Sequence, residues 1–344
     1  MSLPTPLPTL PLGHSGMALS RTGLGTWAMG GQGPRMSWGP QNDEESIRTV
    51  LHAVGNGINW LDTAPVYGLG HAEEVVGRAL RRLPASERPY VFTKCGLRWD
   101  ENAQVTRRGT ADSLRHEAEQ SLRRLGVEQI DLYQMHWPAQ DGTAVEEYWE
   151  TLLELRDAGL VRAVGLSNHG VAELARAAAV ETPASVQPAL SALVRDAAAE
   201  VIPWCRERGV GVVVHSPMHQ GLLSGAFDAR RLRTLAPDDW RRRSAAFSQA
   251  SLAAAGAVVS AFASLGRELG VPTAAVAVAW TLSVPGVTGA IVGARTPGQL
   301  SEWLPAARLR CLEPAAMAQV ASAIREAGAG SGPLVPALEE SVGR

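Results

Sequence analysis

Eight short apolar runs, each followed by a stretch of helical character, constrain the fold of this chain more than any other feature. The runs are about six residues long and rich in valine, isoleucine and leucine, which is typical of parallel strands buried on both faces. They cover residues 24–29, 58–64, 90–95, 131–137, 163–168, 185–190, 211–216 and 289–294. Eight strands that alternate with helices predict an α/β fold, a closed (β/α)8 TIM barrel, rather than an open sheet.

Helix boundary signals separate the runs, with acidic residues at the starts and glycine at the ends. The predicted helices cover residues 43 to about 55–57, 71–82, 112–125, 145–158 and 198–208. The segment from 218 to about 247, after the seventh strand, is predicted to be an extended loop with a binding or covering role. We therefore expect one domain at residues 21–327, between an N-terminal segment (1–20) and a loose C-terminal tail (328–344).

Charge and cysteine content exclude several classes of protein. The net charge is −2 and the arginines are scattered, which argues against a nucleic-acid-binding protein; the densest basic cluster, residues 241–243, is interpreted as a solvated loop. The three cysteines have unrelated spacings, so we expect no disulfide framework and no metal site, and a cytoplasmic protein with reduced thiols. The N-terminus lacks the basic region of a signal peptide, and without a run of 18 apolar residues no membrane span is expected.

Lysine occurs once among the 32 basic residues, as Lys94. A chain that uses arginine wherever a positive charge suffices keeps lysine where a compact ammonium group is needed in a tight space. A strong compositional bias also leaves a stray lysine by chance, so the count alone favours neither interpretation. The position of Lys94, at the end of the third predicted strand, indicates a functional role.

Other polar residues also lie at the carboxyl ends of predicted strands, where (β/α)8 barrels carry their chemistry. Asp62 ends the second strand, with Tyr67 five residues further on, and His136 ends the fourth strand. Taken singly, Asp62 could cap a helix and His136 could be a hydrogen-bonded core histidine. Four ionisable side chains on three consecutive strand ends favour one common site.

These four residues predict a mechanism. A buried Lys94 needs a carboxylate partner to stay charged, and Asp62, at the end of the preceding strand, is the natural candidate. The ammonium group favours the phenolate of Tyr67, which should lower the pKa of that tyrosine from about 10 toward working pH and make it a general acid. His136 can orient a carbonyl. The set is suited to protonating an alkoxide as hydride is transferred to an aldehyde or ketone.

Seven segments carry a resemblance to a known family: GINWLDTAPVYG (57–68), VFTKCG (91–96), IDLYQMHWP (130–138), VGLSN (164–168), VQPAL (186–190), HSPMHQGLLSG (215–225) and GARTPGQLSE (293–302). From about residue 20 to 307 the chain resembles the aldo-keto reductases, in detail the branch with bacterial inositol-operon-type reductases and potassium-channel β subunits. The resemblance implies a barrel that binds NADP(H) without a Rossmann domain, which agrees with the lack of a G-x-G-x-x-G motif.

The resemblance also implies a role for each matching residue. Tyr67 is the general acid, Lys94 with Asp62 lowers its pKa, and His136 orients the carbonyl. Arg295 is positioned to bind the 2′-phosphate of NADPH, since a guanidinium group matches phosphate bidentately. The residues expected at the cofactor are Thr26, Trp27, Ser167, Asn168, Gln187, His215, Ser216, Pro217, Met218, Gly221, Gly293, Arg295, Gln299 and Glu302.

Three positions depart from the family pattern. His215 replaces the aromatic residue that stacks on the nicotinamide in many members, and its imidazole could stack or titrate. Ala226 stands where relatives often have a phosphate-binding lysine, for which Arg230 or Arg241 could substitute. Trp303 replaces an asparagine and could stack on adenine or pack in the core.

The sequence thus predicts a cytoplasmic NADPH-dependent carbonyl reductase acting on a small molecule, with no nucleic-acid or membrane partner. Trp27, Trp99 and Trp137 are candidate walls of an apolar substrate pocket, or ordinary packing at the barrel rim. Two alternatives are an NADPH-binding regulatory protein of the channel β-subunit type and an aldolase that forms a Schiff base on Lys94.

Overall fold

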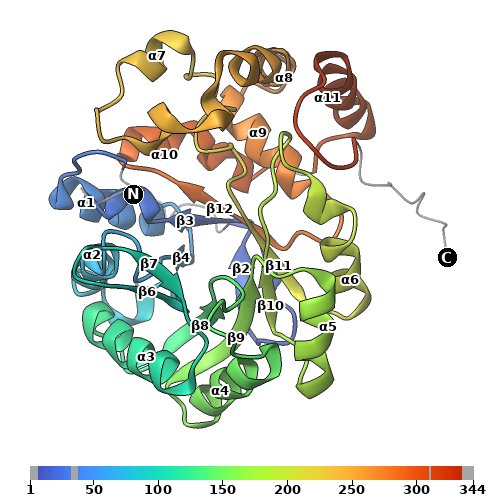
Figure 1. Cartoon of the computed structure of the whole chain (residues 1–344). Helices are drawn as coiled ribbons and strands as arrows, with labels where there is room; N and C mark the ends of the chain where they lie inside the picture. Colours follow the sequence, from blue (N-terminus) through green and yellow to red (C-terminus); the bar gives the residue numbers. More distant parts are fainter. Residues whose placement is uncertain (1–6, 32–37, 310, 335–344) are drawn as a thin grey trace.

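The computed structural model describes residues 7–31, 38–309 and 311–334. Eight parallel strands form a closed barrel, seen end-on with its ring of helices in Figure 1. In barrel order the strands are β3 (Thr22–Gly25), β4 (Trp60–Asp62), β5 (Tyr90–Cys95), β8 (Ile130–Met135), β9 (Val161–Ser167), β10 (Ser185–Gln187), β11 (Gly211–His215) and β12 (Gly289–Gly293). The predicted (β/α)8 architecture is confirmed.

Helices alternate with the barrel strands along the chain. They are α1 (Asp43–Gly55), α2 (His71–Leu80), α3 (Ala111–Leu125), α4 (Val145–Asp157), α5 (Val171–Val180), α6 (Val201–Glu207), α9 (Thr273–Leu282) and α10 (Pro297–Trp303), with α7 (Ala229–Arg233), α8 (Gln249–Leu269) and α11 (Pro314–Ala327) as additions. The predicted helix at 198–208 is shorter than expected, because residues 196–198 form a separate 3-10 turn, η3 (Asp196–Ala198), before α6 begins.

The first strand differs from its prediction. It begins earlier than expected, at Thr22, and ends at Gly25, and residues 27–29 form a 3-10 turn, η1 (Trp27–Met29), instead of continuing the strand. Thr26 still bonds to β4, since its backbone N–H and its hydroxyl both donate to the Asp62 carbonyl, at 3.0 and 3.1 Å, and the Met29 N–H then closes the turn by donating to the Thr26 carbonyl at 2.8 Å. Thr26 and Trp27 therefore lie in the loop after β3, at the mouth of the barrel.

A hairpin of β1 (Thr9–Pro11) and β2 (Ala18–Ser20) forms part of the N-terminal segment. Its buried residues Leu12, Met17 and Leu19 belong to one apolar cluster with Trp60 and Phe92 of the barrel strands. The hairpin thus covers the amino end of the barrel, and the other end is left for polar groups.

Side chains inside the barrel change from apolar to polar along the strands. Because strand side chains alternate with a period of two, each apolar residue is followed two positions later by another inward side chain. The pairs are Trp60 and Asp62 on β4, Phe92 and Lys94 on β5, Leu132 and Gln134 on β8, and Val213 and His215 on β11. The polar layer lies toward the carboxyl ends of the strands.

Residues 328–334 do not form the loose tail expected from their glycines. Ser331 pairs with Val194 in a parallel bridge, and the Arg195 guanidinium donates to the carbonyls of Ala329, Gly332 and Pro333. The remainder of the predicted tail, residues 335–344, lies outside the described residues.

Helix α8 is, among the described residues, the one helix long and apolar enough to pass a length-and-composition test for a membrane span. Its apolar character comes mostly from alanine, and it buries Val258, Phe262 and Leu265 against the rest of the protein. A core helix passes the same test, so this finding carries no argument for a membrane.

Candidate active site

Lys94 and Asp62 form a buried ion pair inside the barrel. Lys94 is 0% exposed, and its Nζ donates to Asp62 Oδ1 at 2.6 Å and to the Thr63 carbonyl at 2.9 Å. The second carboxylate oxygen of Asp62 accepts from Gln187 Nε2 at 2.9 Å. Burial acts to lower the pKa of Lys94, but the charge of Asp62 and the facing Tyr67 raise it above its usual value. Lys94 is therefore an ammonium group at neutral pH.

Tyr67 lies directly opposite this ammonium group, with Lys94 Nζ 5.4 Å from its ring centroid. Burial raises the pKa of Tyr67 above its usual value, although the charge of Lys94 acts in the opposite direction. The expectation that Lys94 brings this pKa below 10 is wrong in its direction, because burial of the phenolate outweighs the nearby charge. Tyr67 therefore keeps its proton at neutral pH, with the positive charge of Lys94 beside its ring.

His136 completes the group at the carboxyl mouth. Its ring meets that of Tyr67 edge to face, with the centroids 5.9 Å apart and the planes at 83°. Burial, together with the positive charge of Lys94, lowers the pKa of His136 well below its usual value. A neutral imidazole that is 9% exposed can offer one N–H to an acceptor in the mouth of the barrel.

The residues after β9 and β11 hydrogen-bond to each other. Asn168 has a φ of 60°, and its Nδ2 donates to the His136 carbonyl at 3.0 Å and to Ser167 Oγ at 3.1 Å. Asn168 Oδ1 lies 3.0 Å from Nε2 of His215. Asparagine tolerates this left-handed conformation better than other non-glycine residues. The structure thus brings together Ser167, Asn168 and His215, but Gln187 directs its amide nitrogen to Asp62 instead.

His215 does not titrate near neutral pH. Burial and the charge of Lys94 lower its pKa to about 4, so the neutral ring is the relevant form. Its Nδ1 lies 3.1 Å from Ser216 Oγ, which also accepts from Gln220 Nε2 at 2.9 Å. The following turn has positive φ at Ser216 (62°), His219 (46°) and Gln220 (53°). Backbone strain of this kind is commonly found at ligand-binding loops.

A second part of the predicted cofactor site is an open cavity of about 560 Å³. It is lined by Pro40, Gln41, Asn42, Glu45, Arg295, Thr296 and Gln299. Arg295 donates to Gln41 Oε1 at 2.7 Å, to the Trp38 carbonyl at 3.0 Å and to the Pro40 carbonyl, so several of its donors are already used.

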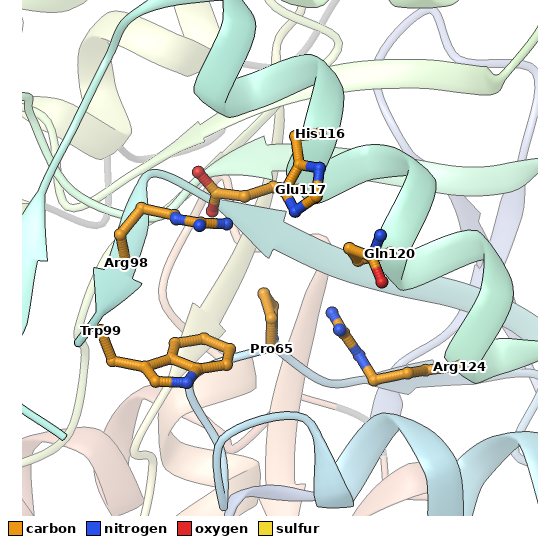
Figure 2. Close-up of a pocket in the computed structure, with 7 residues that line it drawn as sticks. All are labelled: Pro65, Arg98, Trp99, His116, Glu117, Gln120 and Arg124. Atoms are coloured by element: carbon orange, nitrogen blue, oxygen red, sulfur yellow. The ribbon is translucent and has the colours of Figure 1, made fainter. Parts of the chain in front are cut away.

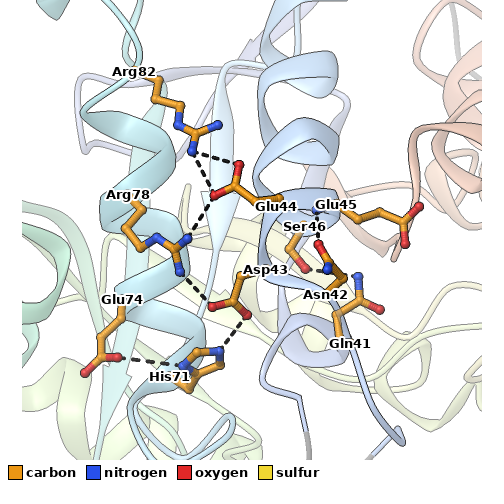
Figure 3. Close-up of polar contacts among 10 residues, drawn as sticks. All are labelled: Gln41, Asn42, Asp43, Glu44, Glu45, Ser46, His71, Glu74, Arg78 and Arg82. Atoms are coloured by element: carbon orange, nitrogen blue, oxygen red, sulfur yellow. Dashed lines mark hydrogen bonds and ion pairs between the residues drawn. The ribbon is translucent and has the colours of Figure 1, made fainter.

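Ion pairs between α1 and α2 fix the wall of this cavity (Figure 3). Asp43 accepts from His71 at 2.8 Å and from Arg78 at 2.7 Å, and Glu44 binds Arg78 and Arg82. Because Asp43 and Glu44 are held toward α2, Glu45 is left on the opposite side of α1, where it lines the cavity beside Arg295.

Two other residues that the sequence places near the cofactor, Trp303 and Arg241, are buried in the structure. Trp303 is 1% exposed and packs in the hydrophobic core, so it does not stack on a ligand. Arg241 is also buried, at 8% exposure, and is not part of a solvated loop; Arg242 and Arg243 are exposed as expected. Arg241 makes a bidentate ion pair with Asp239.

Three tryptophans cover the site: Trp27, which the sequence predicts there, and Trp38 and Trp240, which it does not single out. Trp27 stacks on Tyr67, with centroids 6.1 Å apart, and on Trp240 of the long loop at 5.7 Å. Trp38 meets both indoles edge to face, and the Arg241 guanidinium lies 4.4 Å from its ring. These contacts join loops about 200 residues apart, and no local sequence pattern signals them. The long loop after β11 therefore reaches the barrel mouth.

The other candidate substrate residues lie apart from this aromatic group. Trp137 packs under the Arg107 guanidinium, 4.5 Å from its ring. Trp99 lines a separate cavity with Pro65 and Arg98. Sequence reasoning also missed Gln134, whose buried Nε2 makes no hydrogen bond in the described part of the chain. Among the described residues, no group of three or more His, Cys, Asp and Glu side chains is arranged to hold a metal ion.

A tyrosine hydroxyl beside a buried ammonium group, at the carboxyl end of a closed barrel, is the arrangement of a (β/α)8 barrel enzyme. The chain belongs to the aldo/keto reductase family, whose model matches residues 21–325.

Relatives within the family resemble this chain over most of their own length and most of its length. The chain is 34% identical to an aldo-keto reductase of Bacillus subtilis over 290 residues, which cover 84% of this chain and 85% of the relative. It is 33% identical to the NADH-specific methylglyoxal reductase of Escherichia coli over 305 residues, 85% of this chain and 91% of the relative. A glycerol dehydrogenase from Gluconobacter oxydans superposes with a TM-score of 0.84 at 34% identity, covering 95% of this chain and 98% of the other.

Proposed function

We propose that this protein reduces small aldehydes or ketones to alcohols with NADPH, and that Tyr67 is the proton donor. The observation that carries the proposal is the buried Lys94–Asp62 ion pair facing the Tyr67 ring. A nicotinamide nucleotide, when bound, supplies the hydride. The remaining requirement is a proton for the carbonyl oxygen, and Tyr67 retains one at neutral pH.

Each side chain of the group has a separate task in this proposal. His136, held neutral, donates a hydrogen bond to the substrate oxygen and orients it toward the Tyr67 hydroxyl. As Tyr67 gives up its proton, the fixed charge of Lys94 stabilises the phenolate that remains. Asp62 keeps Lys94 charged and in place. The same charge argues against an aldolase, because an ammonium group is not a nucleophile.

The polar groups around the mouth fit a nicotinamide nucleotide. Gln134 Nε2 is buried without a partner in the described chain, and the hydrogen-bonded set of Ser167, Asn168 and His215 offers amide, hydroxyl and imidazole groups. Arg295 supplies a positive charge in the 560 Å³ cavity for the 2′-phosphate. The other residues we assign to the cofactor are Thr26, Trp27, Gln187, Ser216, Pro217, Met218, Gly221, Gly293, Gln299 and Glu302.

The preference for NADPH needs a direct test, because one relative is named as NADH-specific and Glu45 lines the cavity beside Arg295. The enzyme should oxidise NADPH with at least one member of a panel of short aldehydes and ketones, methylglyoxal included. It should use NADH less efficiently, as measured by kcat/KM with both nucleotides in parallel. Higher kcat/KM with NADH would overturn the NADPH assignment alone. Tight nucleotide binding without turnover of any carbonyl would overturn the reductase and favour a regulatory protein.

We also propose that the protein works in the cytoplasm. All three cysteines, Cys95, Cys205 and Cys311, are free thiols, which fits a reducing cytoplasm.

A further inference from the structure

A second cavity, of about 220 Å³, lies outside the strand barrel between the β6–β7 hairpin and helix α3 (Figure 2). The hairpin consists of β6 (Leu97–Trp99) and β7 (Val105–Arg107). The lining residues are Pro65, Arg98, Trp99, His116, Glu117, Gln120 and Arg124. None of them takes part in the proposed reduction, and the cavity is smaller than the roughly 300–1,000 Å³ of sites for drug-sized ligands.

The two guanidinium groups of the cavity, those of Arg98 and Arg124, differ in how firmly the protein holds them. Arg124 is held by the buried Glu73, whose Oε2 accepts from Arg124 Nε at 2.7 Å, and Nη1 of Arg124 makes no hydrogen bond in the described chain. The guanidinium group of Arg98 has neither a hydrogen bond nor an ion pair among the described residues, and its backbone pairs with Thr106 in the hairpin. Figure 2 shows both side chains extending toward the space between them. The cavity thus holds unused hydrogen-bond donors that carry positive charge.

Glu117, the one carboxyl group that lines the cavity, forms no ion pair with either arginine among the described residues. Glu117 Oε2 accepts from the Gly96 N–H at 2.9 Å, and Oε1 accepts from the Ser113 hydroxyl at 3.0 Å. Both oxygens are therefore committed within the protein, and Arg98 acts on Glu117 only through its charge. Burial raises the pKa of Glu117 to about 7, so a fraction of the molecules carry no negative charge here at neutral pH.

The rest of the cavity lining is partly apolar. Trp99 and Pro65 give one side an apolar, partly aromatic surface, and Gln120 adds an amide. A carboxylate matches a guanidinium fork in a bidentate manner, and a flat apolar body packs on an indole ring. An inorganic anion would use the guanidinium groups but would leave the indole without a partner.

We propose that this cavity is a binding site for a small organic carboxylate, with the carboxylate on Arg98 and Arg124 and the apolar body on Trp99. The proposal is independent of the reductase assignment. Two of the lining residues connect the cavity to the segments of the chain that carry Tyr67 and Lys94: Pro65 precedes Tyr67 by two residues, and Glu117 binds Gly96, which follows Lys94 by two.

The test uses 4-bromobenzoate as the probe on the full chain, with and without NADPH. Titration calorimetry gives the affinity, and the anomalous signal of bromine in soaked crystals gives the position. Arg98→Gln is the variant, and Arg123→Gln on the exposed face of α3 is the matched control with the same loss of charge. Because the Arg98 side chain makes no hydrogen bond in the described chain, and Gln keeps the backbone pairing with Thr106, Arg98→Gln should keep the wild-type melting temperature.

The expected result is a bromine peak beside Trp99 and an affinity that falls roughly 10- to 100-fold in Arg98→Gln, as for a lost charge-assisted hydrogen bond, and stays unchanged in Arg123→Gln. A peak only at another place, or equal affinity in Arg98→Gln, would overturn the site. Inorganic phosphate that binds as tightly as the probe and with the same dependence on Arg98 would overturn the carboxylate class.

Discussion

Replacing Asp62 by asparagine tests how Lys94 acts on Tyr67. The substitution keeps the shape of the side chain and its contact with Gln187 but removes the negative charge 2.6 Å from Lys94 Nζ. A buried ammonium group without a counter-charge is disfavoured, and its pKa falls by as much as about 3–5 units. We therefore expect Lys94 to lose its proton at neutral pH in Asp62→Asn.

The structure sets the size of the effect. With Lys94 Nζ 5.4 Å from the Tyr67 ring centroid and an effective dielectric constant of about 20, the attraction between the ammonium group and the phenolate is roughly 3 kcal/mol. Since about 1.4 kcal/mol corresponds to one factor of ten in rate, losing this attraction should lower kcat by roughly a hundredfold.

The assay is steady-state carbonyl reduction, with nucleotide affinity measured separately. Asp131→Asn is the matched control, because Asp131 is a second barrel-strand carboxylate, less buried than Asp62, that accepts from the Val91 N–H at the start of β5. It should leave kcat unchanged. Asp62→Asn should also recover activity as the pH is lowered through the reduced pKa of Lys94, because the ammonium group re-forms. A kcat for Asp62→Asn within threefold of wild type at pH 7 would refute the electrostatic role of the pair.

Three further predictions concern single residues. Lys94→Arg should fold and bind the nucleotide but reduce carbonyls poorly, because the planar fork does not fit the fully buried position of Nζ; full activity would contradict this. The raised pKa of Glu117 means that the folded protein holds a proton more tightly between pH 4.5 and about 7, so its contribution to stability falls as the pH rises through this window. Relative to Glu117→Gln, wild type should lose up to about 3 kcal/mol of unfolding free energy between pH 4 and 8 in urea titrations, and parallel pH profiles would contradict it. Gly23→Ala should lower the melting temperature because its Cβ would lie 2.3 Å from Trp60, whereas the control Gly256→Ala on α8, with nothing within 4 Å, should not.

The barrel and the group of polar side chains at its mouth could be predicted, because both follow from local periodicity. Buried parallel strands are short apolar runs, and the last inward residue of each strand faces the mouth, so Asp62, Lys94 and His136 were found from strand ends alone. The single lysine of the chain gained meaning in the same way, from its position rather than its count. The end of the first strand differs from its prediction because residues 27–29 turn, with the Met29 N–H donating to the Thr26 carbonyl, although the sequence stays apolar there.

Features that depend on three-dimensional burial could not be predicted. The pKa of Tyr67 rises rather than falls because burial of the phenolate outweighs the charge of Lys94, and neither the depth nor the balance is visible in a sequence. The aromatic cluster of Trp27, Trp38 and Trp240 joins loops far apart in the chain. The neighbouring arginines predict a solvated loop around Arg241, but its guanidinium group pairs with Asp239 and packs over the Trp38 ring.

The most direct test of the central claim is single-turnover hydride transfer in Tyr67→Phe, followed by the loss of NADPH absorbance. The proposal gives Tyr67 the proton and leaves nucleotide binding to other residues, so the variant should bind NADPH as wild type does. Removing the proton donor should slow the transfer by roughly 10²–10⁴-fold, the usual contribution of general acid catalysis. Hydride transfer at the wild-type rate in Tyr67→Phe, with unchanged NADPH affinity, would contradict the claim that Tyr67 protonates the substrate.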